Sequence, residues 1–382
     1  MKLIHLSDLH LGKRVNEFPM IDDQKYILSQ ILQIVDSERA DSVMIAGDIW
    51  DKPVPGADSV ALFDDFLVQL AARQVAVFLI PGNHDSPERV AFGGRLMEQS
   101  KIFPARPYDG TLRPITLEDE SGAINFYLLP FLKPMHVRRF FPQETIENTN
   151  DAVRIALAQA APDFSARNVL IAHQFVTGAA ACESEELSIG GSDNVDSALF
   201  ASFDYVALGH IHNPQHICRP EVRYCGTPLK YSFSEANHEK FVTIVELQQK
   251  GTVSICTIPL HPLHDMREIR GTYDEVTARS FYAQFDRSDY LHVTLTDEED
   301  IPDAMGKLRA VYPNLMKLDY DNLRTRGSAD FSQSVQTEQK TPAELLAEFY
   351  QSQNNQEINP QQAAFAAALI EKIWNNESLN ES

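Results

Sequence analysis

The sequence predicts an α/β layer fold, and two kinds of observation support this prediction. Short apolar runs rich in branched side chains recur along the first two thirds of the chain, each too short to favour a helix. Segments with helical periodicity lie between them. We therefore expect buried strands at residues 3–6, 43–46, 75–80, 169–172 and 205–208.

The segments between the first three expected strands predict helices. Residues 21–40 carry apolar side chains at helical spacing, and the stretch around residues 62–72 repeats the pattern. The order strand, helix, strand, helix, strand is typical of α/β proteins, in which the loops leaving the carboxyl ends of the strands carry the chemistry. We therefore assign residues 1–260 to one such domain.

The remaining sequence predicts smaller units. Residues 261–327 are interpreted as a small β-α-β-α-β module with strands at 266–270, 291–295 and 315–320 and helices at 275–285 and 303–312. Residues 328–339 are polar, rich in Ser, Gln and Thr, and are interpreted as a linker. Residues 340–382 then form a separate helical segment.

Two amphipathic helices are expected in this last segment. The first has Thr341 as N-cap and Pro342 at its first position, and the second begins near Asn359 and Pro360. Two isolated helices behind a linker bury little apolar surface alone, so we expect them to dock on a partner. The alternative, that they fold back on the parent domain, stays open.

Charge and cysteine content exclude several functional classes. The net charge of −21 disfavours binding to a polyanion over the whole surface, so any nucleic-acid contact must be focused. The four cysteines contain no C-x-x-C pair, which argues against a zinc ribbon or a disulfide scaffold and favours a reducing cytoplasm. No apolar run approaches the roughly 20 residues that span a bilayer. We expect no membrane role.

Five short polar segments follow the five expected strands. Carboxylate, amide and imidazole ligands without thiolate suit manganese, iron or zinc, whereas several imidazoles disfavour magnesium. Five of the twelve histidines fall inside these segments, which argues against coincidence. The sequence therefore predicts a two-metal site built from Asp8-Leu9-His10, Gly47-Asp48-Ile49-Trp50-Asp51, Gly82-Asn83-His84-Asp85, Ala172-His173-Gln174 and Gly209-His210-Ile211-His212.

The sequence indicates some of these residues as metal ligands more strongly than others. Asp8 and His10 alternate along an expected strand end, so we expect both on one face, and the same holds for His210 and His212. Asp48 has two oxygens and is the best candidate to bridge two cations. Taken alone, a Gly-Asp pair after a strand is more often a turn, and a lone histidine is more often structural.

This ordered set resembles the calcineurin-like metallophosphoesterases, whose motifs run D-x-H, G-D-x-x-D, G-N-H-D/E, H and G-H-x-H. The resemblance implies a layered β-sandwich flanked by helices. It also implies that one ion is held by Asp8, His10, Asp48 and His212, and the other by Asp48, Asn83, His173 and His210. Two cations roughly 3.5 to 4 Å apart activate water and clamp the reacting oxygens of a phosphoester.

The same resemblance gives the neighbouring residues their expected roles. His84 faces the substrate, where it stabilises the transition state or protonates the leaving oxygen. Asp51 is the candidate that orients His84. Asp85 is an alternative for that role, although capping a turn is the favoured interpretation for it.

Three further features narrow the resemblance to the SbcD family, the nuclease subunits of bacterial SbcC–SbcD complexes. These features are residues 82–89, residues 225–235 and the extra structure after residue 258. This implies Mn²⁺-dependent 3′–5′ cleavage of double-stranded DNA ends and endonucleolytic opening of hairpins or blocked ends, in DNA repair and recombination. It further implies a homodimer within a heterotetramer with an SbcC-type SMC-like ATPase. Residues 261–327 then correspond to a DNA-capping domain, and the tail helices to the ATPase-docking segment.

The basic residues that flank catalytic motifs are Lys13, Arg14 and Arg89, and we expect them to contact DNA phosphates. A small-molecule phosphodiesterase acting on cyclic nucleotides is the alternative that keeps the same metals, although it requires no terminal appendages. A phosphoprotein phosphatase is disfavoured by Lys52 and Asp85, where that branch has Arg and Glu. A non-catalytic scaffold is disfavoured because no ligand is missing.

Overall fold

The computed structural model describes residues 1–182, 185, 193–323, 325, 343, 346–347, 349–351 and 357–377. The chain divides into two compact units, Met1–Met266 and Arg267–Ser382. The expected linker at residues 328–339 lies outside the described residues. So do Thr341 and Pro342, the expected start of the first tail helix.

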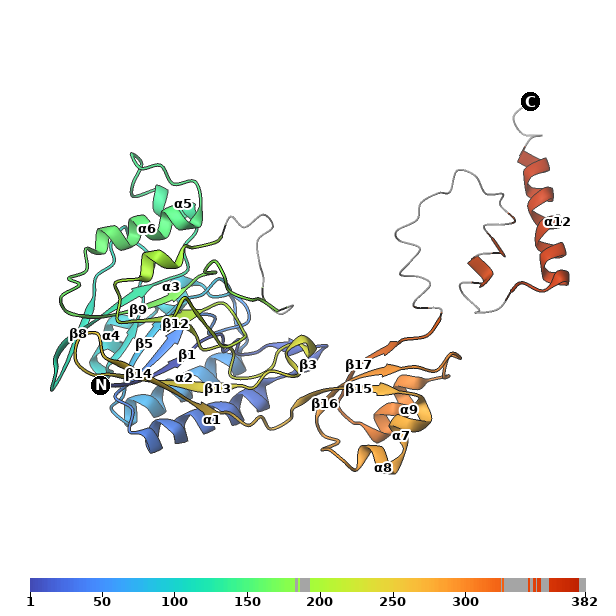
Figure 1. Ribbon diagram of the computed structural model, residues 1–382, viewed down its shortest axis with the longest axis horizontal. Coiled ribbons are helices and arrows are strands. Elements are labelled where there is room, and N and C mark those ends of the chain that lie inside the picture. Colours follow the sequence, from blue (N-terminus) through green and yellow to red (C-terminus); the bar gives the residue numbers. More distant parts are fainter. Residues whose placement is uncertain are drawn as a thin grey trace. The chain divides into compact units, whose positions relative to one another are not determined.

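In its described residues, the first unit contains two mixed six-stranded sheets with helices on the outside (Figure 1), which confirms the predicted sandwich. The first sheet has the spatial order β14 (Val253–Pro259), β13 (Phe241–Leu247), β1 (Lys2–Leu6), β4 (Ser42–Ala46), β5 (Ala76–Ile80), β6 (Ile102–Pro104). The second has the order β11 (Gln215–Ile217), β12 (Arg219–Tyr224), β10 (Tyr205–Gly209), β9 (Arg167–His173), β8 (Gly122–Leu129), β7 (Ile115–Asp119). A short ribbon pairs β2 (Arg14–Val15) with β3 (Phe18–Pro19).

The central strands of both sheets are parallel and buried on both faces. β1, β4 and β5 run parallel in the first sheet, and β8, β9 and β10 run parallel in the second. Every residue of β4, β5 and β9 is buried, which explains why these strands appear as continuous apolar runs. Their carboxyl ends carry the loops that hold the predicted ligands.

Aromatic side chains join the two sheets in the middle of the sandwich. The rings of Phe78 from β5 and Phe126 from β8 stack with centroids 4.1 Å apart and planes 14° from parallel. Both side chains are fully buried. They belong to a cluster that includes Met44, Val169 and Ala207 and fills the space between the sheets. This packing fixes the distance between the two halves of the site.

Helices flank the sandwich on both sides (Figure 1). α1 (Ile21–Glu38) and α2 (Ala57–Ala72) lie against the first sheet, and α1 ends at Arg39, whose φ is 51°. α6 (Thr149–Ala160) packs in the cluster behind the second sheet, and the Asn148 side chain caps its first turn. The described residues of this unit also form α3 (Pro87–Val90), α4 (Gly94–Met97) and α5 (Pro134–Arg138), with 3₁₀ turns at Glu98–Ser100, Ser197–Phe200 and Phe233–Glu235.

The second unit contains a three-stranded sheet with the order β15 (Met266–Gly271), β16 (Tyr290–Leu295), β17 (Leu315–Tyr320). The helix expected at 303–312 is α9 (Ala304–Val311). The prediction of a single helix at 275–285 is wrong, because the segment forms two helices, α7 (Tyr273–Thr277) and α8 (Arg279–Tyr282). They are separated because Ala278 is extended, with ψ of 135°.

The second tail helix begins where the sequence predicts it. α12 (Pro360–Glu377) follows Asn359, whose side-chain oxygen accepts from the backbone N of Gln362 at 2.9 Å. Phe365 is 72% exposed and Leu369 is 48% exposed. Two apolar side chains one turn apart on this helix are therefore exposed. Among the described residues, no helix is long and apolar enough to cross a membrane.

We predict that Phe126→Ala lowers the free energy of unfolding by about 3–5 kcal/mol, because it opens a cavity between the sheets and removes the stack on Phe78. Phe92→Ala is the matched control, since Phe92 is 85% exposed, and should change stability by less than about 0.5 kcal/mol. Urea unfolding followed by circular dichroism measures both. Equal losses in the two variants would contradict the assigned core.

Candidate functional site

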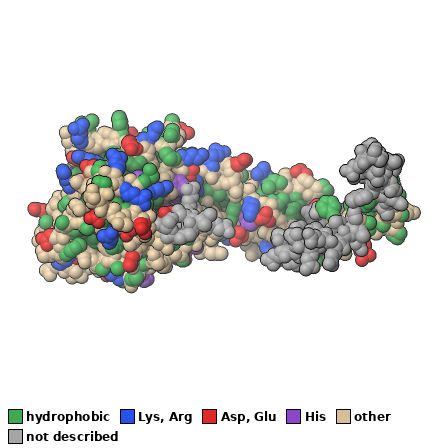
Figure 2. All heavy atoms as spheres, turned by 90° about the horizontal axis from the view of Figure 1, so that it is seen from above, with side chains coloured by type: hydrophobic (Ala, Val, Ile, Leu, Met, Phe, Trp, Pro, Cys, Tyr) green, Lys and Arg blue, Asp and Glu red, His purple; other side chains and the backbone are tan. Residues whose placement is uncertain are grey.

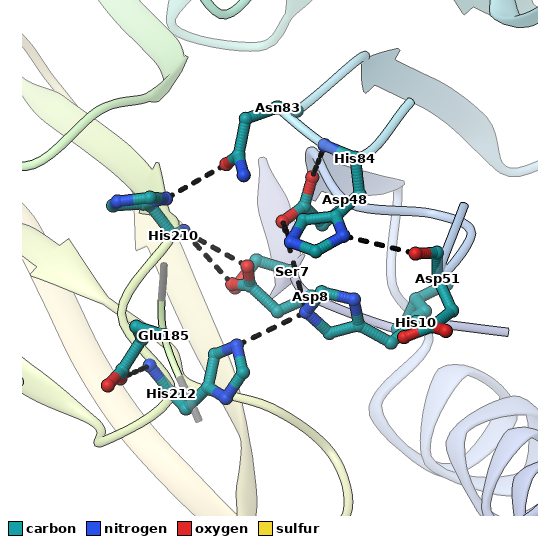
Figure 3. Close-up of polar contacts among 12 residues, drawn as sticks. Ser7, Asp8, His10, Asp48, Asp51, Asn83, His84, Glu185, His210 and His212 are labelled. Carbon is teal, nitrogen blue, oxygen red and sulfur yellow. Dashed lines mark hydrogen bonds and ion pairs between the residues drawn. The ribbon is translucent and has the colours of Figure 1, made fainter. Parts of the chain in front are cut away.

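The loops after five parallel strands meet at one edge of the sandwich and bring all seven predicted ligands together. All of them except His173 are labelled in Figure 3. Six of these side chains belong to buried residues, and Asn83 is half-buried. Asp8, His10 and Asp48 come from the first sheet's loops, as does Asn83 after β5. His173 ends β9, and His210 and His212 follow β10.

The backbone at the site is strained. Asp8, His10, Asp48 and His210 have φ values of 53°, 43°, 49° and 102°, a region that residues with side chains rarely adopt. The expectation that Asp8 and His10 alternate along a strand is wrong, because β1 ends at Leu6. The same expectation for His210 and His212 is also wrong, since β10 ends at Gly209.

Backbone hydrogen bonds between loops take the place of the expected strand geometry. Asp8 N donates to Gly47 O at 3.0 Å, and His10 N donates to Asp48 O at 3.0 Å. The loop after β1 is thereby held alongside the loop after β4. Strain of this kind persists only where surrounding structure holds it, and it is common at functional sites.

Glycines allow the loops to approach this closely. A Cβ atom on Gly82 would lie 2.1 Å from Oδ1 of Asp48, and one on Gly209 would lie 1.9 Å from the Ala46 carbonyl oxygen. Both distances are far inside van der Waals contact. The two glycines are therefore required by the packing of the site itself.

One group of ligands contains Asp8, His10 and His212, whose ligand atoms lie within 4.8 Å of one another. The Nε2 atoms of His10 and His212 are 3.1 Å apart. A cation about 2.1 Å from each nitrogen fits between them. The donor chemistry of this group therefore suits one metal ion.

The other group contains Asn83, His173 and His210. The side-chain oxygen of Asn83 lies 3.0 Å from Nε2 of His173 and 3.0 Å from Nδ1 of His210. Nδ1 of His173 donates to the Ala46 carbonyl at 2.8 Å, which directs Nε2 into the site. This group suits a second ion.

Asp48 lies between the two groups. Its Oδ2 is 3.4 Å from Nε2 of His173 and 3.8 Å from Nε2 of His10, which belong to different groups. Its Oδ1 accepts from the backbone N of His84 at 2.9 Å. This is the position that a bridging carboxylate requires.

Burial and neighbouring charges shift the pKa values of these groups. Burial raises the pKa of Asp8. For Asp48, burial opposes ionisation, but the His173 imidazole and its neighbours outweigh burial and lower the pKa. Burial lowers the pKa of His210 to about 3. Burial also acts to lower the pKa of His173, but the Asp48 carboxylate outweighs it and raises that pKa to about 9.

His84 lies beside the ligands but is more open, with 18% of its side chain exposed. Its Nδ1 is 3.0 Å from the backbone carbonyl oxygen of Asp51. Asp51 therefore contacts His84 through its backbone, while its carboxylate accepts from Lys13 Nζ at 3.0 Å. Asp85 caps both loops, because it accepts from the backbone N of Gly82, Ile49 and Trp50.

The predicted DNA contacts differ in their surroundings. Lys13 is paired with Asp51 and lies over the Tyr231 ring, 5.7 Å from its centroid. Arg14 and Arg89 are exposed. In Figure 2, Lys and Arg side chains gather on the first unit near one of the places where histidine is visible.

Sequence reasoning missed some neighbours of the ligands. Phe131 follows β8, a strand that the apolar runs did not reveal, and its ring centroid lies 6.1 Å from His173 and 6.4 Å from His210. Glu185 accepts from the backbone N of His212 at 2.6 Å (Figure 3). Glu235 lies 3.7 Å from the His212 ring. Only Glu235 lies in a segment that the sequence singled out.

Comparison with known proteins identifies the family. Residues 1–214 match the model of the calcineurin-like phosphoesterases, and residues 262–354 match the model of the type 5 capsule protein repressor C-terminal domain. The chain is 30% identical over 381 residues to the D subunit of the nuclease SbcCD from Staphylococcus epidermidis, a match that covers 99% of this chain and 100% of that protein. The chain belongs to the SbcD family of calcineurin-like phosphoesterases. As a member of the SbcD family, it is a metal-dependent phosphodiesterase of the nuclease type.

Two solved structures are also similar to this SbcD family member. A dimetal phosphatase from Danio rerio is 13% identical with a TM-score of 0.40, covering 68% of this chain and 99% of its own. A protein from Thermus thermophilus is 10% identical with a TM-score of 0.38, covering 67% of this chain and 98% of its own.

We predict that binding of Mn²⁺ releases a proton from His173. Asp48 raises the pKa of His173 to about 9, so this imidazole is charged in the metal-free protein at pH 7.5, and it must become neutral to bind metal. Metal affinity should therefore rise about tenfold per pH unit between pH 7 and pH 8.5. Titration calorimetry in buffers of different ionisation enthalpy measures the release.

The control for this measurement is His173→Asn, which keeps a neutral ligand but has no titrating imidazole. It should show less buffer dependence than the parent protein. Binding enthalpies that do not depend on the buffer in the parent protein would contradict the assignment.

Proposed function

We propose that this chain is the nuclease subunit of an SbcCD-type complex. Its activity is two-metal-dependent 3′–5′ exonucleolytic cleavage of double-stranded DNA and endonucleolytic cleavage at hairpins and blocked ends. It acts in DNA repair and recombination with an SbcC-type SMC-like ATPase. The observation that carries the proposal is the convergence of four imidazoles, one amide and a second carboxylate around Asp48, in a chain similar to an SbcCD subunit over nearly its whole length.

One ion would be held by Asp8, His10 and His212, and the other by Asn83, His173 and His210. Asp48 would be shared by both ions. We propose Mn²⁺ because this donor set has more imidazole than Mg²⁺ prefers and no thiolate. Two such ions, when bound, supply Lewis acidity to the phosphodiester and lower the pKa of water.

His84 acts on the substrate. Its Nδ1 faces the carbonyl oxygen of Asp51, so Nδ1 must be protonated and must donate a hydrogen bond to that oxygen. This hydrogen bond fixes the ring and directs Nε2 toward the site, where it lies 3.9 Å from Oδ2 of Asp48. From there it can stabilise charge on the phosphate or give a proton to the leaving oxygen.

DNA is held by focused contacts and by the partner. A net charge of −21 repels a polyanion from most of the surface, and pairing with Asp51 offsets the charge of Lys13. We assign direct phosphate contacts to Arg14 and Arg89, which are exposed beside the ligand loops, and a weaker one to Lys13. The partner ATPase then supplies the remaining DNA affinity.

The tail docks on the ATPase. Phe365 and Leu369 are exposed one turn apart on α12, and Phe349 is also 61% exposed. An amphipathic helix of this kind is suited to a hydrophobic groove or a coiled-coil surface. The same proposal includes the assembly: two copies of this chain form a homodimer within a heterotetramer with the ATPase.

Two substitutions separate metal binding from chemistry. We predict that Asp48→Ala loses bound metal, because this carboxylate lies between both groups, whereas His84→Gln keeps both ions and loses cleavage by at least about 100-fold. Inductively coupled plasma mass spectrometry and a nuclease assay on the same preparations decide it. Equal metal depletion in both variants would refute the assigned roles.

The substrate class is tested with the purified chain, Mn²⁺ and three substrates: hairpin DNA, end-labelled linear duplex and a cyclic nucleotide. We expect cleavage of both DNA substrates, with duplex products that shorten from the 3′ end. His84→Gln, prepared in parallel, controls for contaminating nucleases. Turnover of the cyclic nucleotide alone would overturn the proposal.

Removal of residues 336–382 tests the docking role. We predict unchanged Mn²⁺-dependent cleavage of short single strands, because the metal site lies in the first unit, and loss of co-purification with an SbcC-type ATPase. In the full chain, Phe365→Asp should weaken the complex and Gln361→Asp on the same helix should not. Retained co-purification of the truncated chain would rule out this docking site.

A further inference from the structure

The segment between β12 and β13 contains a buried ion pair that none of the assigned roles explains. Residues 225–235 form part of the sequence resemblance but hold no predicted ligand. In the structure, Glu235 and Thr227 are fully buried and Lys240 is 6% exposed. Burying two charges is costly unless their geometry satisfies them well, so this pair requires an explanation.

The ammonium group of Lys240 is fully satisfied. Its Nζ donates to Glu235 Oε2 at 2.5 Å, to Thr227 Oγ1 at 2.7 Å and to the carbonyl oxygen of His212 at 3.0 Å. A lysine has three protons, and all three are used. Lys240 therefore has no donor left for a substrate, and its role is to hold the protein groups around it.

Glu235 connects this lysine to the ring of His212. Its Oε2 accepts from Lys240, while its Oε1 lies 3.7 Å from Nδ1 of His212. On the other side of the same ring, Nε2 of His212 lies 3.1 Å from Nε2 of His10. One imidazole thus separates the buried carboxylate from a group of metal ligands.

The two groups of ligands are supported differently. His173, in the group with Asn83, has its outer nitrogen hydrogen-bonded to the neutral carbonyl of Ala46. His212, in the group with Asp8 and His10, has a carboxylate at the corresponding position. A carboxylate partner orients an imidazole and increases its basicity as a ligand.

We infer that Glu235, held by Lys240, is a positioning residue for His212, orienting that ring toward the ion bound with Asp8 and His10 and strengthening that ion's binding selectively. The inference rests on the proposed two-metal function. Glu235 touches neither the substrate nor an ion. It acts only through the His212 imidazole.

The test is Mn²⁺ binding by titration calorimetry, together with electron paramagnetic resonance, on the full chain and Glu235→Gln. The parent protein should bind two ions and give the signal of a spin-coupled pair. In Glu235→Gln, one ion should bind about 10- to 100-fold more weakly while the other keeps its affinity, and the coupled signal should give way to that of isolated Mn²⁺.

Matched variants separate positioning from a structural role. Thr227→Val removes a partner of Lys240 and Glu235 without removing the carboxylate beside His212, so it should leave both affinities unchanged even if it lowers stability. Glu246→Gln changes an exposed carboxylate on β13 and should have no effect. Glu235→Asp keeps the charge and should recover part of the lost affinity.

The outcomes distinguish this inference from the proposed function. A parent protein that does not bind two ions would refute the two-metal function itself. Two ions bound with parental affinity by Glu235→Gln would overturn the inference alone. So would an equal loss of both ions, or failure of both Glu235 variants to fold, because each result assigns Glu235 a general structural role.

Discussion

The cost of burying charge is the constraint on which the rest of this structure depends. Asp8 and Asp48 are carboxylates with almost no contact with water, placed among four buried imidazoles. An unpaired carboxylate in such a place is strongly destabilising, so the fold must provide compensating cations or protons. The imidazoles supply part of this compensation in the metal-free protein, as the opposite pKa shifts of Asp48 and His173 indicate. Divalent ions can replace those protons.

This constraint explains the construction around the site. Ligands from two sheets converge only because parallel strands in both sheets end at the same edge, and the Phe78–Phe126 stack keeps the sheets together. Left-handed backbone at four ligands requires support from elsewhere. The Asp85 carboxylate supplies some of it by joining the loops after β4 and β5 through three backbone N–H groups. Gly82 and Gly209 permit contacts that no side chain would allow.

The sequence was sufficient to predict the layered fold and the residues that converge, because buried parallel strands leave short, continuous apolar runs with polar residues after them. It could not predict how the ligands converge. The strand-face argument for Asp8 and His10 was wrong because β1 ends before them, and inter-loop hydrogen bonds have no local pattern. The hydrogen bond between His84 and the Asp51 backbone, and the pairing of the Asp51 carboxylate with Lys13, also depend on three-dimensional proximity. The sequence therefore could not predict them. The break in the helix expected at 275–285 was missed because apolar periodicity continues across Ala278.

The most direct test of the two-metal site is anomalous diffraction at the manganese edge from crystals of the protein grown with Mn²⁺. We predict two peaks roughly 3.5 to 4 Å apart, with Asp48 between them, one beside His10 and His212 and the other beside Asn83 and His173. A single peak, or a pair of peaks that Asp48 does not bridge, would contradict a shared two-metal centre.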